Sequence, residues 1–455
     1  MPPLDLSAAR SRIPFSPHRA AERLDPFWDY VWSRGSVAQW RSRRKEQSRR
    51  YAGVGRAASW FHTDAEFVEA AGANLHRARR EVKLGVMGAL DSWRTMTAQQ
   101  ASAFLGESCL LTSSAQLVRE LYALDLVDVG SDAGFSDKRV TGDDVREWLI
   151  RPTRSTQFQK LIAPTLTFPE SVHLTGGDAY LTGGQYDRHN VLATELGLRL
   201  AEFTRAAAVL GEKWCGATEL LFEGWGRTTP YPSLQNRADL AVVRPDGLRV
   251  AIEMTASAGG KSFDRKVAKW AQQLAVQPLS EQGTVVLFVV CGEQHPKTGD
   301  TDALRRQVQA AIVRAVRSFP GNPGNLVAER MLVASWTDWF PGRHQLIDNF
   351  DKLPAWYPAK MVGAQGMEQV WAQTELFNQA AFPYAPAAGL DPLAVAANAR
   401  TLAATPHWMR EDDIPQIAFD AVKEMWPAGP PGVTREQLVG RGARAAITLP
   451  ERCEL

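Results

Sequence analysis

The sequence has little of what marks secreted, membrane and metal-cluster proteins. Its 455 residues include only four cysteines, Cys109, Cys215, Cys291 and Cys453, which lie far apart and share no metal-ligand spacing. Such cysteines are typical of reduced thiols in a cytoplasmic protein. No apolar run approaches the length of a membrane span, and the N-terminus lacks the charged-then-apolar order of a secretory signal. We therefore expect a cytoplasmic location and no membrane partner.

The sequence also lacks an excess of charge of either sign and the common catalytic and cofactor-binding motifs. The net charge is only +2, with no Ser-His-Asp signature, zinc spacing, dinucleotide fingerprint or internal repeat. The chain has 45% apolar and 22% charged residues, as globular proteins do. Its length predicts two or three domains.

Two acidic residues fall on neighbouring strands of a predicted hairpin. The strands cover residues 237–243 and 248–255, around a turn at 245–247, and bring Asp239 close to Glu253. Paired carboxylates are costly to desolvate unless a cation neutralises them. Mg²⁺ is the expected ion, since it binds a few carboxylates plus waters and supports phosphodiester hydrolysis. The alternative is an ordinary pair of acids on solvated strand ends.

The order of elements around this hairpin predicts an α/β core. A helix that carries Glu195 precedes the hairpin, and a basic helix over 261–274 and a very apolar strand over 283–290 follow it. A further strand at 330–336 can extend the sheet. The αββαβ order resembles the PD-(D/E)XK nuclease superfamily, and we place such a domain at residues 185–340.

The resemblance implies roles for individual residues. Asp239 and Glu253 match the two metal-binding acids, and Glu195 is the candidate for the acid on the preceding helix. Thr255 stands where the family has its catalytic lysine, and a hydroxyl cannot supply that positive charge. The basic helix offers two replacements, Lys261 and Lys266.

A second unit is predicted at residues 96–150. Thr97 caps a helix that ends at Gly106, a second helix covers 112–124, and a strand begins near 125. Helix, turn, helix and strand outline a winged helix-turn-helix with a wing near 135–140. The alternatives are an ordinary two-helix packing unit and a winged helix used for protein contacts.

Candidate contacts to double-stranded DNA lie in two places. Four residues occupy the start and outer face of the second helix, where side chains can reach bases or phosphates. Four of the five arginines in the basic run 41–50 are the other candidates, since this run can neutralise phosphates or form a solvated face. The candidates are Ser113, Ser114, Gln116 and Arg119 on the helix, and Arg43, Arg44, Arg49 and Arg50 in the run.

The winged helix, the stretch 186–190 that begins the next helix, and the acidic hairpin together resemble the actinobacterial replication-relaxation family of plasmid and mobile-element proteins. The likeness covers roughly residues 96–290. It implies a DNA-binding protein of a mobile element or phage-like region that cuts, nicks or only grips the duplex in replication, transfer or DNA processing. The alternative is a non-catalytic regulator or assembly protein with a degenerate nuclease fold.

The two ends of the chain match nothing in that family. Residues 1–95 are predicted as a basic arm and helices, and residues 341–455 as an aromatic-rich helical accessory region and tail that could dock a protein partner. The predicted fold class is thus multidomain α/β, with a winged helix-turn-helix, a PD-(D/E)XK nuclease-like domain and a helical C-terminal region.

Overall fold

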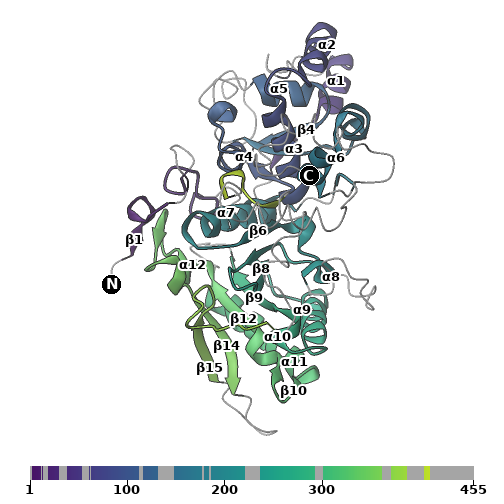
Figure 1. Ribbon diagram of the computed structural model, residues 1–455. Helices are drawn as coiled ribbons and strands as arrows, with labels where there is room; N and C mark the ends of the chain where they lie inside the picture. The colour runs from purple at the N-terminus through teal and green to yellow at the C-terminus, as the bar shows by residue number, and fades with distance from the viewer. Residues whose placement is uncertain are drawn as a thin grey trace. The chain divides into compact units, whose positions relative to one another are not determined.

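The structure is a computed structural model of the whole chain, shown in Figure 1. It is described here for residues 3–11, 13, 19–29, 38–53, 61, 63–111, 116–131, 148–176, 179–183, 186–220, 236–292, 301–360, 370–386 and 404–409. The fold is mixed α/β, as predicted, and divides into two compact units. Unit 1 comprises Met1–Arg12, Phe27–Asp29 and Arg199–Ala396, and unit 2 comprises Ile13–Pro26, Tyr30–Leu198 and Ala397–Leu455.

Unit 1 is built on a seven-stranded sheet in the order β15-β14-β12-β9-β8-β7-β6. Strands β6, β7 and β8 are antiparallel neighbours, whereas β8, β9 and β12 run parallel. Every residue of β8 and β9 is buried, as expected for parallel strands covered on both faces. The strands are β6 (Ala208–Gly211), β7 (Leu240–Val243), β8 (Arg249–Thr255), β9 (Thr284–Val290), β12 (Met331–Ser335), β14 (Pro354–Lys360) and β15 (Val370–Glu375).

Helices gather beside the central strands of this sheet, where Figure 1 shows α9, α10 and α11 next to β9 and β12. The predicted basic helix is confirmed as α9, because Val267, Trp270, Ala271 and Leu274 recur at helical spacing and are buried. The remaining elements of unit 1 are α8 (Ala217–Leu220), α9 (Lys261–Leu274), α10 (Leu279–Gln282), α11 (Thr301–Ser318), α12 (Trp336–Trp339), and the short strand pairs β1 (Leu4–Asp5) with β13 (Gln345–Leu346) and β10 (Gly321–Asn322) with β11 (Asn325–Leu326).

The predicted hairpin, the apolar strand and the strand that extends the sheet are confirmed as β7–β8, β9 and β12. The region after 341 differs from the helical expectation as far as residue 386, because it adds β14 and β15 to the sheet edge. Pro354 and Pro358 lie within β14. Proline disrupts the interior of a helix, whereas a strand near the edge of a sheet tolerates it. Most residues after 386 lie outside the described part.

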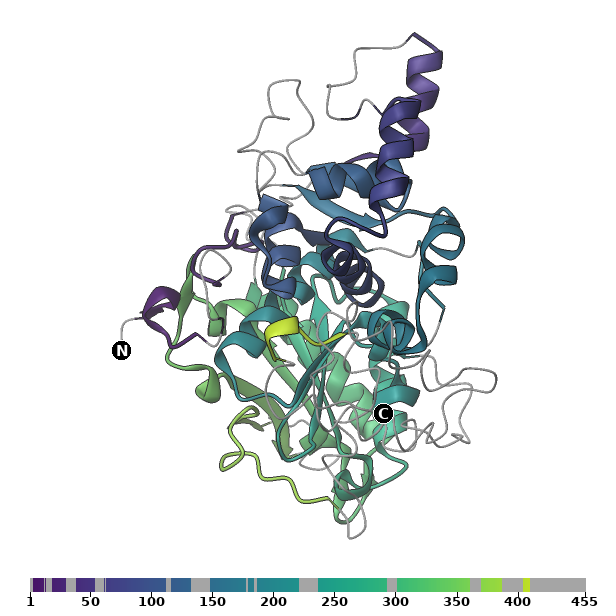
Figure 2. The same ribbon diagram turned by 45° about the horizontal axis from the view of Figure 1, so that its top comes forward.

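Unit 2 contains a four-stranded sheet in the order β2-β4-β5-β3, with all three pairings antiparallel. Figure 2 shows the first two helices, in purple, next to one another. Helix α7 begins in unit 2 and its last residues belong to unit 1. The elements are β2 (Gln39–Arg41), α1 (Arg43–Tyr51), α2 (Ala65–Asn74), α3 (Arg80–Trp93), β3 (Met96–Thr97), α4 (Ala98–Leu105), α5 (Gln116–Ala123), β4 (Val127–Ser131), β5 (Leu149–Pro152), α6 (Phe168–Thr175) and α7 (Asp187–Phe203).

The predicted capped helix of unit 2 is confirmed as α4. The Thr97 hydroxyl accepts the Gln100 N–H, and the Gln100 side chain accepts the Thr97 N–H in return, which forms a capping box. Gly106 ends the helix at a φ of 74°, a conformation that favours glycine.

Among the described residues, no helix is long and apolar enough to cross a membrane.

Candidate active site

Asp239 and Glu253 lie on the same hairpin of unit 1. Asp239 directly precedes β7, and its N–H donates to the Ile252 carbonyl at 3.0 Å. The register begins with the pair of Leu240 and Ile252, so Asp239 lies just beyond it, next to the strand that carries Glu253. The Met254 N–H donates to Asp239 Oδ2 at 2.6 Å, which ties the first acid to the strand that carries the second. The two predicted acids are therefore close neighbours.

Glu253 is almost fully buried, with a relative exposure of 2%. Its Oε1 accepts the indole N–H of Trp270 at 2.7 Å, and its Oε2 contacts the ammonium of Lys266. Burial raises the pKa of Glu253 to about 7, with Lys266 opposing the rise and the charge of Asp239 adding to it. The environment of this acid thus resists a bare negative charge and favours a nearby cation.

Lys266 supplies that cation from α9. Lys266 and Trp270 are four residues apart, so both side chains lie on the face of α9 that meets Glu253. Burial would lower the pKa of Lys266, but the charges of Glu253 and Asp239 outweigh it and raise the pKa overall. The Asn236 side-chain amide donates to the Lys266 carbonyl at 3.1 Å and fixes the backbone at this point.

The structure distinguishes between the two lysines that the sequence offers. Lys266 reaches Glu253, whereas Lys261 is exposed at the first position of α9. Thr255 is buried at the end of β8, and its hydroxyl donates to the Glu253 carbonyl at 3.4 Å. Thr255 therefore makes a backbone contact and supplies no charge.

Glu195 belongs to unit 2. Its carboxylate pairs with the buried Arg23 guanidinium at 3.0 and 3.2 Å and accepts a hydrogen bond from Gln100 at 3.3 Å. The structure thus gives this carboxylate partners within its own unit. In the described part of the chain, no group of three or more His, Cys, Asp or Glu residues could hold a metal ion.

A two-carboxylate Mg²⁺ site nevertheless fits the chemistry of the hairpin. Mg²⁺ is commonly bound by one or two carboxylates together with waters and substrate phosphates. Within the described residues, Asp239 Oδ2 has the Met254 N–H as its partner and Oδ1 makes no hydrogen bond. Glu253 Oε2 could become a ligand once Lys266 moves away from it.

Of the four DNA-contact candidates on the predicted second helix, the structure describes two, Gln116 and Arg119, and both lie on α5. Gln116 is exposed at the start of α5, whereas the guanidinium of Arg119 stacks on the Phe67 ring at 4.3 Å. Ser113 and Ser114 lie outside the described residues, as does the expected wing at 135–140.

The basic run forms helix α1. Arg44, Arg49 and Arg50 are exposed there, whereas Arg43 is half-buried. Arg49 lies 3.6 Å from the buried Glu46, a weak ion pair that leaves the guanidinium accessible. Helix α1 therefore offers exposed positive charge to an anionic partner.

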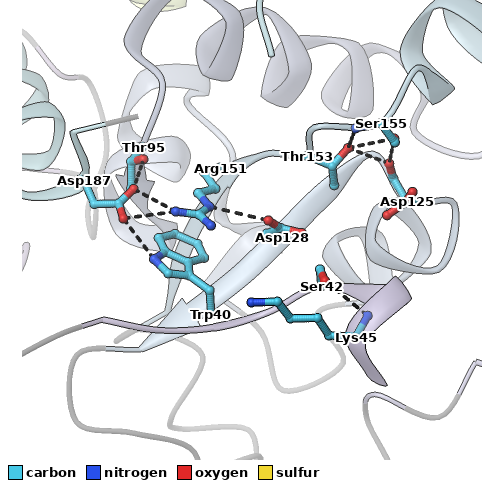
Figure 3. Close-up of polar contacts among 10 residues, drawn as sticks. All are labelled: Trp40, Ser42, Lys45, Thr95, Asp125, Asp128, Arg151, Thr153, Ser155 and Asp187. Carbon is cyan, nitrogen blue, oxygen red and sulfur yellow. Dashed lines mark hydrogen bonds and ion pairs between the residues drawn. The ribbon is translucent and has the colours of Figure 1, made fainter. Parts of the chain in front are cut away.

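A polar cluster that the sequence did not predict fastens the start of α7 to the sheet of unit 2 (Figure 3). Asp187 accepts hydrogen bonds from Trp40 at 3.0 Å, Thr95 at 2.7 Å and Arg151 at 3.1 Å. The Arg151 guanidinium also stacks on the Trp40 ring at 3.9 Å and lies 3.5 Å from Asp128. These residues are distant in sequence, so no local motif could have indicated their contact.

No protein-family model, no curated protein and no solved structure matches this chain.

Proposed function

We propose that the protein binds double-stranded DNA and cleaves or nicks it in a Mg²⁺-dependent reaction at Asp239 and Glu253. The contact between Lys266 and Glu253, next to Asp239, carries this proposal. It places an ammonium beside the acid pair, which offsets the missing lysine at Thr255. Nuclease chemistry needs such a positive charge near the scissile phosphate, because negative charge develops in the transition state.

The arrangement of elements supports the same proposal. Helix α7 is followed by the antiparallel strands β6, β7 and β8, by helix α9, and by β9 parallel to β8. This order resembles the PD-(D/E)XK core, and Asp239 and Glu253 stand at the positions of its acids. The likeness is an argument from topology and motif, and the site chemistry has to carry the activity.

Each residue of the site has a distinct role in this proposal. Asp239 and Glu253 would hold Mg²⁺, which when bound supplies an activated water and neutralises charge on the phosphate. Trp270 keeps Glu253 Oε1 in one orientation through its indole N–H. Lys266 holds a positive charge at the site and can donate a hydrogen bond to a phosphate oxygen.

Unit 2 supports DNA binding through its likeness to a winged helix. Strands β3, β5 and β4 form an antiparallel sheet, and α4 and α5 lie between β3 and β4 in the sequence. Together with the exposed arginines of α1, this unit would grip the duplex while unit 1 acts on it. From the resemblance to the replication-relaxation family, we propose that this activity serves the replication or transfer of a plasmid or mobile element.

The second candidate function is a non-catalytic DNA-binding regulator or assembly protein. Thr255 favours it, because the residue at the lysine position makes only a backbone contact. Glu195 favours it as well, because its partners Arg23 and Gln100 belong to unit 2. In this case the hairpin would be a scaffold.

A cleavage assay on supercoiled plasmid with Mg²⁺ or Mn²⁺ separates the two functions. Asp239→Ala and Glu253→Ala should each reduce the cleavage rate by about a hundredfold or more, since each removes a group that stabilises the transition state. DNA affinity should stay near that of the native chain. Asp264→Ala is the matched control, because this acid of α9 is half-exposed and pairs with Arg314.

Lysine variants complete the test. Lys266→Ala should abolish cleavage, whereas Lys261→Ala should leave it unchanged, since only Lys266 reaches Glu253. DNA binding without cleavage of supercoiled, linear or single-stranded substrates would establish the scaffold function. Thr255→Lys is then the informative variant, because it restores the charge at the position where the family has it.

A further inference from the structure

Lys266 occupies the place that a metal ion would need. Its ammonium contacts Glu253 Oε2, while the other oxygen of this carboxylate is bound to the Trp270 indole. Of the described residues, Lys266 is the cationic group in contact with Glu253. We propose that Lys266 is a tethered competitor of the divalent cation, which must displace it from Glu253 in order to bind. The inference rests on the proposed metal-dependent function and adds a determinant of its metal affinity.

The two cations exclude one another on electrostatic grounds. A divalent ion at Glu253 Oε2 would lie within a few ångströms of the Lys266 ammonium that contacts the same oxygen. Repulsion between charges at that separation is strong where water is scarce, and Glu253 is only 2% exposed. Metal binding at Glu253 Oε2 and the Lys266 contact are therefore alternatives.

Lys266 is able to leave, whereas Trp270 is not. The Lys266 side chain is 38% exposed on a flexible stem, so solvent can accept the released ammonium. Trp270 is fully buried and keeps its hydrogen bond to Oε1. Displacement would thus free one oxygen of Glu253 without disturbing the rest of the carboxylate. The released ammonium stays tethered near the site, where a phosphate oxygen can receive it.

The competition predicts that a neutral side chain at position 266 tightens metal binding. Isothermal titration calorimetry with MnCl₂, without DNA and at pH 8.5, compares the native chain with Lys266→Met and Lys266→Gln. If Lys266 holds the site for at least nine-tenths of the time, its removal should lower the dissociation constant about tenfold or more. Lys269→Met is the matched control, because it makes the same charge change on the same helix and should leave the affinity unchanged.

Every outcome decides the proposal. Tighter binding by the Lys266 variants supports it, including the case in which the native chain binds Mn²⁺ too weakly to measure. Equal or weaker binding by both variants overturns it, as does the absence of Mn²⁺ binding in all chains. Lys266→Gln keeps a hydrogen-bond donor for Glu253, so it serves if Lys266→Met does not fold, which circular dichroism reveals.

The experiments distinguish a failure of the proposed competition from a failure of the proposed nuclease function. Metal-dependent plasmid cleavage by the native chain, with unchanged affinity in the variants, would refute the competition and leave the nuclease intact. Tighter metal binding in the variants, with no cleavage by the native chain, would refute the nuclease and leave the competition intact.

Discussion

Three buried carboxylates show how the surroundings decide what one residue type does. Glu195 pairs with Arg23 through both oxygens, which is a stable ion pair. Glu253 has the partly exposed Lys266 and the buried Trp270 as partners. Asp128 has one long contact to Arg151, and its Oδ1 is buried without a hydrogen-bond partner among the described residues. Of the three, Glu253 is the carboxylate whose partner cation we propose to be exchangeable.

The hydrogen bond from Trp270 to Glu253 should contribute measurably to stability. Trp270→Phe removes the N–H but keeps a large aromatic ring, so the free energy of unfolding should fall by about 1.5–3 kcal/mol, as for other hydrogen bonds to charged groups. Urea denaturation measures the change. Trp339→Phe is the control, because this equally buried tryptophan donates to the neutral Pro354 carbonyl at 2.8 Å and should cost only about 1 kcal/mol of hydrogen bonding. Equal losses in the two variants would show that the charge of Glu253 adds nothing.

Asp128 should make stability depend on pH. Burial raises its pKa from 3.8 to about 6, and Arg151 offsets the rise only in part. Because the folded-state pKa is the higher one, the protonated acid favours folding, and this stability is lost as pH rises from about 4 through 6. The loss is up to about 3 kcal/mol, since one pKa unit corresponds to about 1.4 kcal/mol.

Asp128→Asn removes this titration. Between pH 4.5 and 7.5, the variant should therefore gain stability relative to the native chain as the pH rises, which urea denaturation at several pH values detects. The exposed Asp351→Asn controls for the general loss of a carboxylate. Parallel pH curves for the native chain and Asp128→Asn would contradict the assignment.

At the scale of elements, apolar periodicity and capping predicted correctly the helices and the hairpin whose own residues carry these patterns. Helix α9 begins at Lys261 and ends at Leu274, the bounds that its sequence pattern predicts. Strand β2 shows the opposite case, since three residues remote in sequence from residues 96–150 pair with β4 and extend that sheet. The residue of β4 that lies opposite Trp40 has to leave room for the indole ring.

Gly130 on β4 is that residue. A Cβ at Gly130 would lie 2.7 Å from the Trp40 ring, closer than side chains tolerate. Gly130→Ala should therefore lower the free energy of unfolding by about 1–3 kcal/mol through overpacking. In a Trp40→Ala background the same change should cost almost nothing, so a double-mutant cycle by urea denaturation should give a coupling energy of about 1–3 kcal/mol. Additive effects would show that β2 does not pack on β4 in this way.

At the scale of the whole molecule, neither unit is a continuous stretch of chain. Met1–Arg12 belongs to unit 1, where β1 pairs with β13, although most of that unit starts at Arg199. The described residues 404–409 return to unit 2, where the Trp408 indole donates to the Ala103 carbonyl at 2.8 Å. Cutting the chain at residue 95 or 198 would separate such partners, so the proposed binding and activity have to be tested on the full chain.

DNA binding by the full chain should weaken as salt rises. If the exposed Arg44, Arg49 and Arg50 of α1 contact phosphates, their joint replacement by alanine should reduce the slope of log affinity against log salt by up to about 3, or about 0.9 for each contact. Fluorescence anisotropy with a labelled duplex at several salt concentrations measures it. Arg343, Arg314 and Lys352 form a control set of equal charge, since each is at least half-exposed and pairs with an acid of unit 1. The same slope in the native chain and the α1 variant would make that helix a solvated face.

The sequence by itself determined the elements that rest on neighbouring residues. The hairpin of Asp239 and Glu253, the basic helix α9, the apolar strand β9 and the capped helix α4 follow from strand alternation, helical periodicity and capping, which act over a few residues. Only the tertiary structure decided that Lys266 and not Lys261 reaches Glu253, that Trp270 holds its second oxygen, and that Glu195 pairs with Arg23. Those contacts join residues 13 to 172 positions apart, and they depend on how helices and strands pack, because burial forces each charged group to find a partner wherever the fold provides one.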